Sequence, residues 1–374
     1  MNILILGSHS FSTPGIKVGI QFIAEHLAKS GNNVSYISVP SSPIDILSQR
    51  TRQRFKKAWM NSDRTLTIRD GLTEFFVKSL WTSSKLTFRY EWQTPIYGAL
   101  LPENIKKTYY DIVIHDSSTS AILLESISSK KYVYRVNDTP KGFEHHTGKT
   151  ISKWFDSKIK CGFYDAFWVS SHSQIEQILE LNKLSNTIYI PNGYDSDNYS
   201  IAEKKEFENG AVFIGAISEW IDFKLIEETA AILEDWNFDF YGPNLISYQP
   251  TNKNIRMLGP IDNKEATKTL SRYAVGLIPY KNKGHVSDIE RPIKFYEYIA
   301  AHLGVAATDI PSFRKGMGNM ACFGANARDF AECIRTAKSI AASKNEAYFR
   351  ELIDSVSWKN IFSIIDKETK SLWK

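Results

Sequence analysis

Short apolar segments alternate with helical periods along the whole chain, and this alternation constrains the fold more than any other feature. In the first half the strand-like segments are residues 2–6, 33–39, 110–115, 131–136, 165–171 and 187–192. The second half repeats the cycle at residues 210–217, 237–242, 254–259, 274–280 and 304–308. Strands that alternate with helices build layers around mostly parallel sheets. The chain is therefore predicted to form two α/β units.

The predicted boundary between the two units lies near residues 191–200, a loop-forming stretch. Residues 1–191 are assigned to an N-terminal domain and residues 192–355 to a C-terminal domain. The final segment, residues 356–374, has the period of an amphipathic helix, which we expect to pack back on the N-terminal domain.

The composition fits a protein that folds around packed cores without crossing a membrane. The 374 residues are 43% hydrophobic and 13% aromatic, which is enough for two cores. No run of about 18 uncharged apolar residues occurs, so a spanning helix is not expected. The start, "MNILILGSHS", is interpreted as a buried strand rather than a signal peptide. Cys161, Cys322 and Cys333 lack metal-ligand spacing and indicate reduced thiols in a cytoplasmic protein.

Basic residues are concentrated in the first half. Residues 1–190 contain 23 Lys and Arg against 16 Asp and Glu, and the excess gathers between Arg50 and Arg89. Aromatic residues, including Trp59 and Trp81, are interleaved with these charges. The pattern suits docking on an anionic membrane surface, although a solvated basic face is the alternative. A nucleic-acid partner is not expected, because no recognition motif accompanies the charge.

The loop after the first strand reads "GSHSFSTPG", which differs from the G-x-G-x-x-G of dinucleotide-binding folds. With His9 among small and hydroxyl residues just before a helix, the loop suits a ligand at a cleft between domains. The alternative is a tight turn whose serines cap the helix.

A carboxylate follows a predicted central strand in "YRVNDTPKGF". Asp138 would then lie at the strand edge where α/β sheets bind their ligands. There it could accept the proton of an attacking hydroxyl. A turn aspartate before proline is the alternative.

In the second half, Gly215 and Gly242 each lie near the C-terminal end of a predicted strand segment. Glycines at these points would let the phosphates or the base of a ligand approach the backbone, although turn glycines are also common. Tyr280 ends a strand at "GLIPY", where it either packs against a nucleoside or belongs to the core.

The segment "ERPIKFYEYIAAHLGVAATD", residues 290–309, begins as a helix and ends as a strand. Pro292 suits the first helical turn and Gly304 the helix end. Lys294 in the first turn has the wrong sign for the helix dipole, which suggests that an anion binds there. Glu297 lies three residues later on the same face.

Together these motifs resemble a known family. The two α/β halves, the "P-x-K-x-x-E-Y-x-A-A" helix and a closing "SW" helix are similar to the GT-B glycosyltransferases. The motifs "SHSFSTP", "VYRVND", "GLIPY" and "IKFYEYIAAHLG" resemble, in order and spacing, the xanthan-type bacterial glucuronosyltransferases of exopolysaccharide assembly. The resemblance implies an α/β fold of the GT-B type, with two Rossmann-like domains facing a central cleft.

The resemblance also implies roles for individual residues. Lys294 would bind the diphosphate of a nucleotide sugar, and Glu297 would accept ribose hydroxyls. Asp138 matches the proposed catalytic base, and His9 matches a cleft histidine. The chain departs from the family at Glu297, where the family has an amide. It also departs at Ile293 and Ile217, where the family has methionines near the nucleotide. Ile217 and Glu290 are assigned to the donor site together with Lys294, Glu297, Tyr280, Gly215 and Gly242.

The implied activity is inverting, metal-independent transfer of a sugar, with glucuronic acid as a candidate, from a UDP-linked donor to a saccharide or lipid-linked saccharide. No cofactor is implied, and no D-x-D metal site follows a strand. The implied location is cytoplasmic, peripheral on the inner face of the plasma membrane. A retaining transferase needs two glutamates eight residues apart, and Glu290 and Asp288 each miss that spacing by one residue. A nucleotide-sugar epimerase of the same fold is the other alternative.

Overall fold

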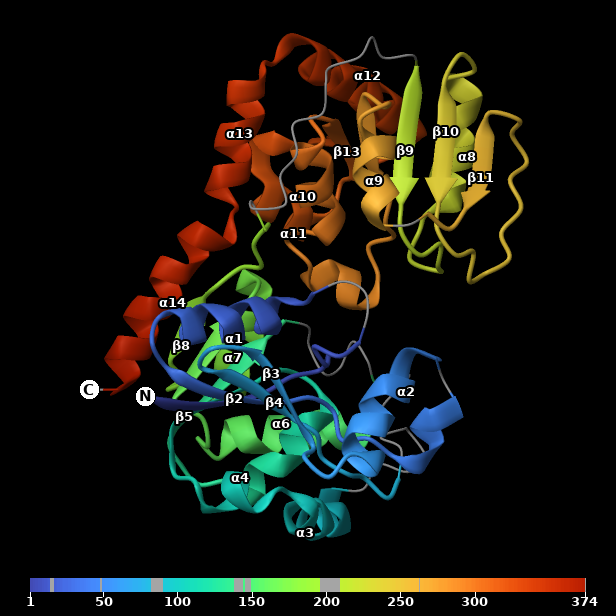
Figure 1. The fold of residues 1–374 in the computed structure, drawn as a ribbon. Coiled ribbons are helices and arrows are strands. Elements are labelled where there is room, and N and C mark those ends of the chain that lie inside the picture. The colour runs from blue at the N-terminus through green and yellow to red at the C-terminus, as the bar shows by residue number, and fades with distance from the viewer. Residues whose placement is uncertain are drawn as a thin grey trace. The chain divides into compact units, whose positions relative to one another are not determined.

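The computed structural model shows two compact units, each with its own sheet and core (Figure 1). Unit 1 consists of Met1–Asn192 and Phe362–Lys374, and unit 2 of Gly193–Ile361. The two α/β sheets confirm the predicted fold class. The structure describes residues 1–13, 17–47, 49–81, 90–137, 144, 149–195, 209–261 and 263–373.

The sheet of unit 1 has eight strands in the order β3-β4-β2-β1-β5-β6-β7-β8. All neighbouring strands are parallel except β3 and β4. The strands are β1 (Asn2–Leu6), β2 (Asn33–Ile37), β3 (Thr65–Arg69), β4 (Leu72–Phe75), β5 (Tyr110–His115), β6 (Ser129–Val136), β7 (Ala166–Val169) and β8 (Thr187–Tyr189). The six strands predicted for the first half are present.

Strands β3 and β4 fall outside the predicted segments. They form an antiparallel hairpin at the edge of the sheet, and Gly71 turns the chain between them with a φ of +76°. No residue of β3 is fully buried. Its polar residues, and a glutamate inside β4, interrupt the apolar run that identifies buried strands.

Helices and short helical turns cover the sheet of unit 1. Most are amphipathic, and in the first of them Ile20, Ile23 and Leu27 are buried at helical spacing. The elements are α1 (Gly19–Lys29), η1 (Pro43–Leu47), α2 (Gln49–Phe55), η2 (Lys56–Met60), α3 (Tyr90–Leu100), α4 (Glu103–Lys107), η3 (Thr119–Ser126), α6 (Lys149–Lys160) and α7 (His172–Leu181).

The core of unit 1 lies on both faces of its parallel strands. Leu4, Val113, Tyr134 and Phe167 come from four neighbouring strands and are all buried. Parallel strands covered on both faces need continuous apolar sequences, which explains why these strands were predictable. The predicted C-terminal helix is α14 (Trp358–Trp373). Within unit 1 its Asp366 lies 2.8 Å from Nε2 of His26.

The sheet of unit 2 is fully parallel, with the strand order β11-β10-β9-β12-β13-β14. The strands are β9 (Gly210–Ile214), β10 (Asn237–Tyr241), β11 (Ile255–Gly259), β12 (Val275–Ile278), β13 (Gly304–Thr308) and β14 (Cys322–Gly324). The five strands predicted for the second half are present, and β14 lies outside the predicted segments.

The helices of unit 2 pack on both faces of this sheet, and α12 packs against β13 and α8. They are α8 (Phe223–Ile232), α9 (Asn263–Leu270), η6 (Gly284–Asp288), α10 (Ile293–Ala300), α11 (Pro311–Met317), η7 (Gly318–Met320), α12 (Ala327–Ser343), α13 (Glu346–Ser355) and the first turn of α14. Among the described residues, no helix is both long enough and apolar enough to cross a membrane.

The prediction that Gly304 ends a helix is wrong. Helix α10 ends at Ala300, and His302 takes the left-handed conformation with a φ of +61°. Gly304 instead opens β13. A Cβ on Gly304 would collide with the backbone carbonyl of Ala337 in α12, so the missing side chain allows that helix to approach the strand.

Candidate functional site

In each sheet, two neighbouring strands mark the place where the order of strands reverses. In unit 1 these strands are β1 and β5: the strand that follows β1 in the chain lies on one side of the pair, and the strand that follows β5 lies on the other side. In unit 2 the corresponding pair is β9 and β12. In open parallel sheets, the loops that leave such a pair of strands separate and open a crevice where ligands bind. These two edges are therefore where each unit is expected to hold a ligand.

The two glycines predicted to bind the donor follow neighbouring strands of unit 2. Gly215 comes directly after β9 and has a φ of +147°, and Gly242 comes after β10 with a φ of +140°. A Cβ on Gly242 would collide with the carbonyl of Gly215. The two loops thus touch backbone to backbone, which only glycine permits here.

Lys294 lies against this pair of loops. It is the second residue of α10, and a Cβ on Gly215 would overlap the end of its side chain. Its ammonium lies 4.9 Å from the ring centre of Phe213 in β9. Among the described residues, no carboxylate lies within ion-pair distance of Lys294. Pro292 gives α10 no side-chain cap. A cation and a helix N-terminus without a side-chain cap are thus directed at the loop after β9.

Glu297 lies one helical turn after Lys294 and is half-buried. Burial raises the pKa of its carboxyl, whereas the charge of Lys294 lowers it. The nearby ammonium therefore favours the ionised form of the carboxyl, against the effect of burial. In that state it can accept hydrogen bonds from hydroxyl groups.

The other residues predicted for the donor site are buried or half-buried. Ile217 is 1% exposed and Glu290 is 4% exposed, so both side chains lie in the protein interior. Tyr280 is half-buried and contacts Phe213 and Phe313, with ring centres 6.3 Å apart in each pair. Gly215 contacts both Gly242 and Lys294, and the backbone N–H of Ile217 donates to the carbonyl of Pro243, next to Gly242, at 2.9 Å.

At the crevice of unit 1, Asp116 follows β5 and holds the loop that follows β1. Its Oδ2 accepts a hydrogen bond from the backbone N–H of Ser8 at 2.7 Å, and its Oδ1 accepts one from Ser118 at 3.1 Å. Burial raises the pKa of Asp116, and these hydrogen bonds lower it. Asp116 was not predicted, although its position after "DIVIH" marks a strand end.

His9 lies on this anchored loop. Its Nδ1 is 3.0 Å from the hydroxyl of Ser8, and its carbonyl accepts a hydrogen bond from Tyr36 at 2.7 Å. Two residues later, the N–H of Phe11 donates to Glu74 at 3.0 Å. The loop is therefore attached to β2, to β4 and to the residue that follows β5. This arrangement gives His9 a fixed backbone position at the edge of the sheet.

Glu74 is the residue of this crevice that sequence reasoning missed most clearly. It lies in β4 and is fully buried. Burial raises its pKa to about 7, although hydrogen bonds from Ser10, Ser38 and Phe11 and the charge of Arg54 lower it. The available signal was the single acid in the apolar run "LTEFFV".

The predicted catalytic base, Asp138, lies outside the described residues, as do residues 139–143. Strand β6 ends two residues earlier, at Val136. The structure therefore leaves the role of Asp138 as a prediction. Among the described residues, no group of His, Cys, Asp and Glu side chains has the geometry of a metal site.

Comparison with known proteins bears on both units. Residues 5–147 match the family described as glucuronosyltransferase GumK, N-terminal domain. Over 109 residues the chain is 34% identical to the putative teichuronic acid biosynthesis glycosyltransferase TuaH of Bacillus subtilis (strain 168). That match covers 28% of this chain and 27% of TuaH, so it spans about a quarter of the relative's length.

Solved structures resemble the chain over its whole length. Sucrose-phosphate synthase (tll1590) from Thermosynechococcus elongatus aligns with a TM-score of 0.70 and 13% identity, covering 100% of this chain and 99% of that one. Anabaena Alr3699/HepE in complex with UDP and glucose aligns with a TM-score of 0.62 and 10% identity, covering 99% and 100%. At these identities the likeness shows the fold alone. The chain thus has the GT-B fold of glycosyltransferases, and its first unit resembles the GumK-type N-terminal domain, as the sequence motifs predicted.

Proposed function

We propose that the chain is a glycosyltransferase that transfers a sugar from a UDP-linked donor to a saccharide acceptor with inversion at the anomeric carbon. The observation that carries the proposal is the position of Lys294 against Gly215, which itself contacts Gly242, at the crevice of unit 2. An ammonium beside a helix N-terminus fits a diphosphate. HepE, whose structure holds UDP and glucose, supports UDP as the nucleotide.

In the proposed reaction Asp138 takes the proton of the acceptor hydroxyl, a role supported by its place in "VYRVND". The hydroxyl oxygen bonds to the anomeric carbon while the bond from that carbon to the diphosphate breaks. The diphosphate leaves with the electron pair, and Lys294 and α10 stabilise its charge. Because the protein supplies this positive charge, we expect transfer without an added metal ion.

Glu297 has a separate role in the proposal, which is to accept hydrogen bonds from the ribose. Its position one turn after Lys294 on α10 supports this role, because the ribose lies next to the diphosphate in a nucleotide. The ammonium helps keep the half-buried carboxyl ionised. Glu297→Gln should therefore change UDP affinity only modestly, since an amide oxygen also accepts hydrogen bonds.

The proposed donor sugar is glucuronic acid, and the proposed acceptor is a lipid-linked saccharide of polysaccharide assembly. The match of residues 5–147 to a glucuronosyltransferase domain supports the proposed donor sugar. The similarity to TuaH, a putative teichuronic acid biosynthesis glycosyltransferase, supports the proposed acceptor. The reaction would take place in the cytoplasm, on the inner face of the plasma membrane.

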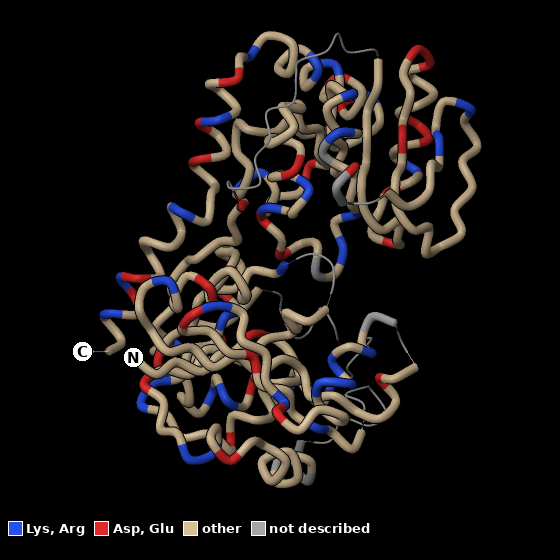
Figure 2. Tube along the Cα trace, in the orientation of Figure 1, with Lys and Arg blue, Asp and Glu red and all other residues tan. Residues whose placement is uncertain are grey.

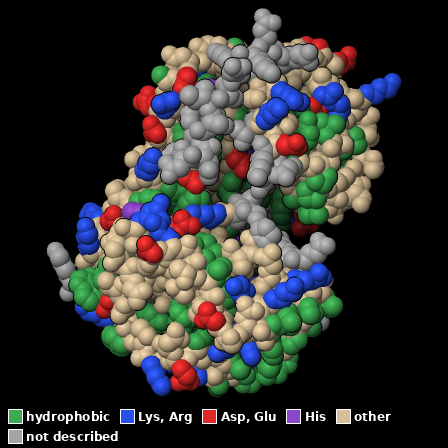
Figure 3. Space-filling model, viewed as in Figure 1, with side chains coloured by type: hydrophobic (Ala, Val, Ile, Leu, Met, Phe, Trp, Pro, Cys, Tyr) green, Lys and Arg blue, Asp and Glu red, His purple; other side chains and the backbone are tan. Residues whose placement is uncertain are grey.

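The surface around α2 supports a membrane location. Ile44, Leu47 and Met60 are 60%, 78% and 69% exposed, and they flank this basic helix in sequence. Figure 2 shows basic residues along α2, and in Figure 3 green hydrophobic side chains adjoin blue basic ones on this part of unit 1. Apolar and basic side chains together suit the headgroup layer of an anionic membrane. Arg54 is excluded from this role because it pairs with Asp45 at 3.1 Å.

Binding and turnover measurements test the proposed function. By calorimetry, Lys294→Ala should weaken UDP binding by about 10- to 100-fold, because a charge-assisted hydrogen bond contributes roughly 1.5–3 kcal/mol. Lys315→Ala is the matched control, since Lys315 is an exposed lysine of the same unit. Unchanged UDP affinity in Lys294→Ala would refute the donor site.

Product analysis separates the alternatives. With UDP-glucuronic acid, UDP should appear only when an acceptor is present, and the new linkage should have the inverted anomeric configuration. Conversion of the nucleotide sugar without an acceptor would indicate an epimerase. A retained configuration would indicate the other transferase mechanism.

A further inference from the structure

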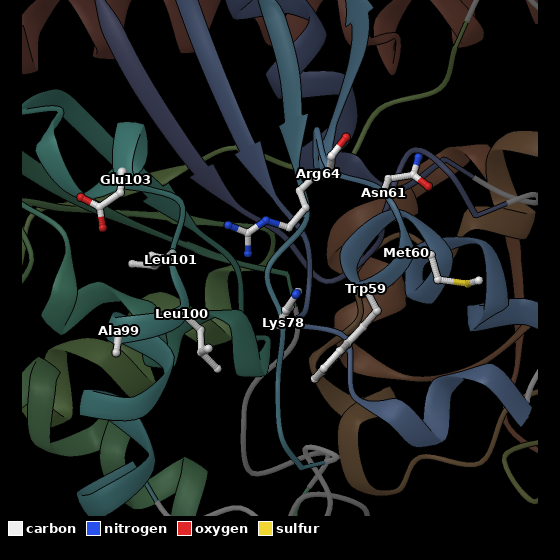
Figure 4. A pocket seen from close by; sticks show the side chains of 10 residues that line it. Trp59, Met60, Asn61, Arg64, Lys78, Ala99, Leu100, Leu101 and Glu103 are labelled. Atoms are coloured by element: carbon white, nitrogen blue, oxygen red, sulfur yellow. The ribbon is translucent and has the colours of Figure 1, made fainter.

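Unit 1 contains a pocket of about 630 Å³ that is lined by none of the residues assigned to the two crevices (Figure 4). Its walls come from segments far apart in the sequence: the turn η2, the ends of the β3–β4 hairpin, and the junction of α3 and α4. Ligand pockets for small molecules have volumes of roughly 300–1,000 Å³. The pocket is therefore large enough for one or two sugar rings.

The aromatic residue of the pocket, Trp59, and one of its cations, Lys78, both contact the backbone of Ser41. The carbonyl of Ser41 accepts hydrogen bonds from the indole N–H of Trp59 at 2.7 Å and from the backbone N–H of Ser79 at 2.8 Å. Ser41 also forms a bridge with Lys78 across the strand ends. Trp59 and Lys78 are thus held in register with each other by the backbone.

Two cations face this pocket, and neither forms an ion pair with a residue that the structure describes. The ammonium of Lys78 lies 5.1 Å from the ring centre of Trp59, and Arg64 lies nearby on the same wall (Figure 4). Both side chains are half-buried. Among the described residues, no carboxylate lies within ion-pair distance of Arg64 or Lys78. A partly desolvated cation without a counter-ion is costly, and an anionic ligand would offset that cost.

The carboxylate of the pocket does not cancel these charges. Glu103 is exposed and forms ion pairs with Lys106 at 3.3 Å and Lys107 at 3.5 Å in its own helix. Hydrogen bonding to Lys106 lowers the pKa of Glu103. The opposite wall is otherwise apolar, with Leu100 and Leu101. Within the described part of the chain, the pocket therefore offers two cations without a paired carboxylate, an aromatic face and an apolar wall.

We propose that this pocket binds an anionic sugar, with the acidic group on Arg64 and Lys78 and the ring against Trp59. Guanidinium groups bind phosphate and carboxylate in a bidentate manner, and an aromatic ring offers a flat apolar surface to a sugar. Two sources share this chemistry, a sugar phosphate and a uronic acid. The inference rests on the proposed function only in assigning the bound sugar to the acceptor, because binding itself is measured without transfer.

Calorimetry on the full chain tests the proposal with four probes: glucose 1-phosphate, glucuronate, glucose and inorganic phosphate. At least one anionic sugar should bind ten or more times more tightly than glucose. Glucose 1-phosphate ahead of glucuronate would identify a phosphorylated sugar as the ligand, and the reverse order a uronic acid. Equal affinity for glucose and both anionic sugars would overturn the proposal.

Substitutions of the lining residues test whether the anionic sugar binds in this pocket. Arg64→Gln and Lys78→Gln should each weaken the preferred anionic sugar about tenfold, whereas Lys160→Gln, an exposed lysine of unit 1, should not. Trp59→Leu should weaken the anionic sugar and leave inorganic phosphate unchanged. Thermal melting checks folding, and Arg64→Lys, which keeps the charge, replaces Arg64→Gln if that variant unfolds.

Comparing the variants of the two sites shows whether the pocket proposal or the proposed donor site is wrong. If anionic-sugar binding is lost in Lys294→Ala and kept in Arg64→Gln and Lys78→Gln, the ligand occupies the donor crevice and the pocket proposal is wrong. If UDP binding is insensitive to Lys294 while the sugar still depends on Arg64, the proposed donor site is wrong and the pocket stands.

Discussion

The side chain of Lys294 occupies the space that any side chain on Gly215 would need. This contact joins the start of α10 to the loop after β9. It places an ammonium where the two crevice loops of unit 2 meet. Neither residue could be substituted freely without affecting the position of the other.

Gly215→Ala should therefore weaken UDP binding without removing any polar group. The new methyl group would push the Lys294 ammonium away and cost at least one charge-assisted hydrogen bond, which corresponds to about tenfold or more in affinity. Stability should also fall, because Gly215 has a φ of +147°. Calorimetry with UDP and thermal melting measure the two effects.

Gly318→Ala is the matched control for this substitution. Gly318 also has a positive φ, +51°, but a Cβ there would meet nothing within 4 Å. It should lose stability and keep its UDP affinity. An equal loss of affinity in both variants would mean that backbone strain, rather than displacement of Lys294, weakens binding.

Asp138→Asn should abolish transfer while leaving UDP affinity nearly unchanged. A general base typically contributes about 10²–10⁴-fold in rate, and the amide cannot accept the proton. Turnover at saturating acceptor, measured beside calorimetry with UDP, separates the two effects. If the variant keeps most of its turnover, Asp138 is a turn residue and the base lies elsewhere.

Glu74 should make stability depend on pH between about 4.5 and 7. Its pKa is raised from 4.5 to about 7, so the folded state binds a proton more tightly than the unfolded state. Stability must then fall as the pH rises through this window and level off above it, by an amount on the order of 3 kcal/mol. Glu74→Gln should lack this fall and gain stability relative to the wild type at pH 8.

The measurement is the difference in unfolding free energy between wild type and Glu74→Gln from pH 4 to pH 8. Taking a difference is necessary because burial lowers the pKa of His115 to about 4, which removes stability as the pH falls. Glu176→Gln, at an exposed position in unit 1, controls for the substitution. A difference that stays constant over the whole range would contradict the assignment.

Docking on membranes should require anionic lipid and weaken as salt rises. Replacing Arg52, Lys56 and Lys57 with Ser should reduce vesicle binding strongly, because each basic residue near anionic lipid contributes about 1 kcal/mol. Replacing Lys149, Lys153 and Lys160 of α6 removes the same charge from exposed positions elsewhere in unit 1 and is the control. Sedimentation with neutral and anionic vesicles measures binding, and equal recovery with both would rule out electrostatic docking.

The sequence alone determined the fold class and the positions of the main strands. Strands such as β1, β5 and β9 are buried on both faces, so their apolar runs are visible without the structure. The same local logic identified Gly215, Gly242 and Lys294 as candidates, because strand ends and helix starts are defined by short segments. The GumK-like motifs in the first unit were visible for the same reason.

Only the tertiary structure decided which of these residues meet. The contact of Lys294 with Gly215 depends on how the start of α10 lies beside the end of β9. Ile217 is buried in the hydrophobic core of unit 2, and Glu290 is buried where Gly316 of α11 approaches it. Glu74 looks like a surface residue in sequence, and its burial becomes visible only when Ser10, Phe11 and Ser38 surround it. The pocket beside Trp59 likewise exists because Ser41 joins segments that are distant in the chain. Local patterns record burial and turns, whereas these contacts come from long-range packing, which no short segment encodes.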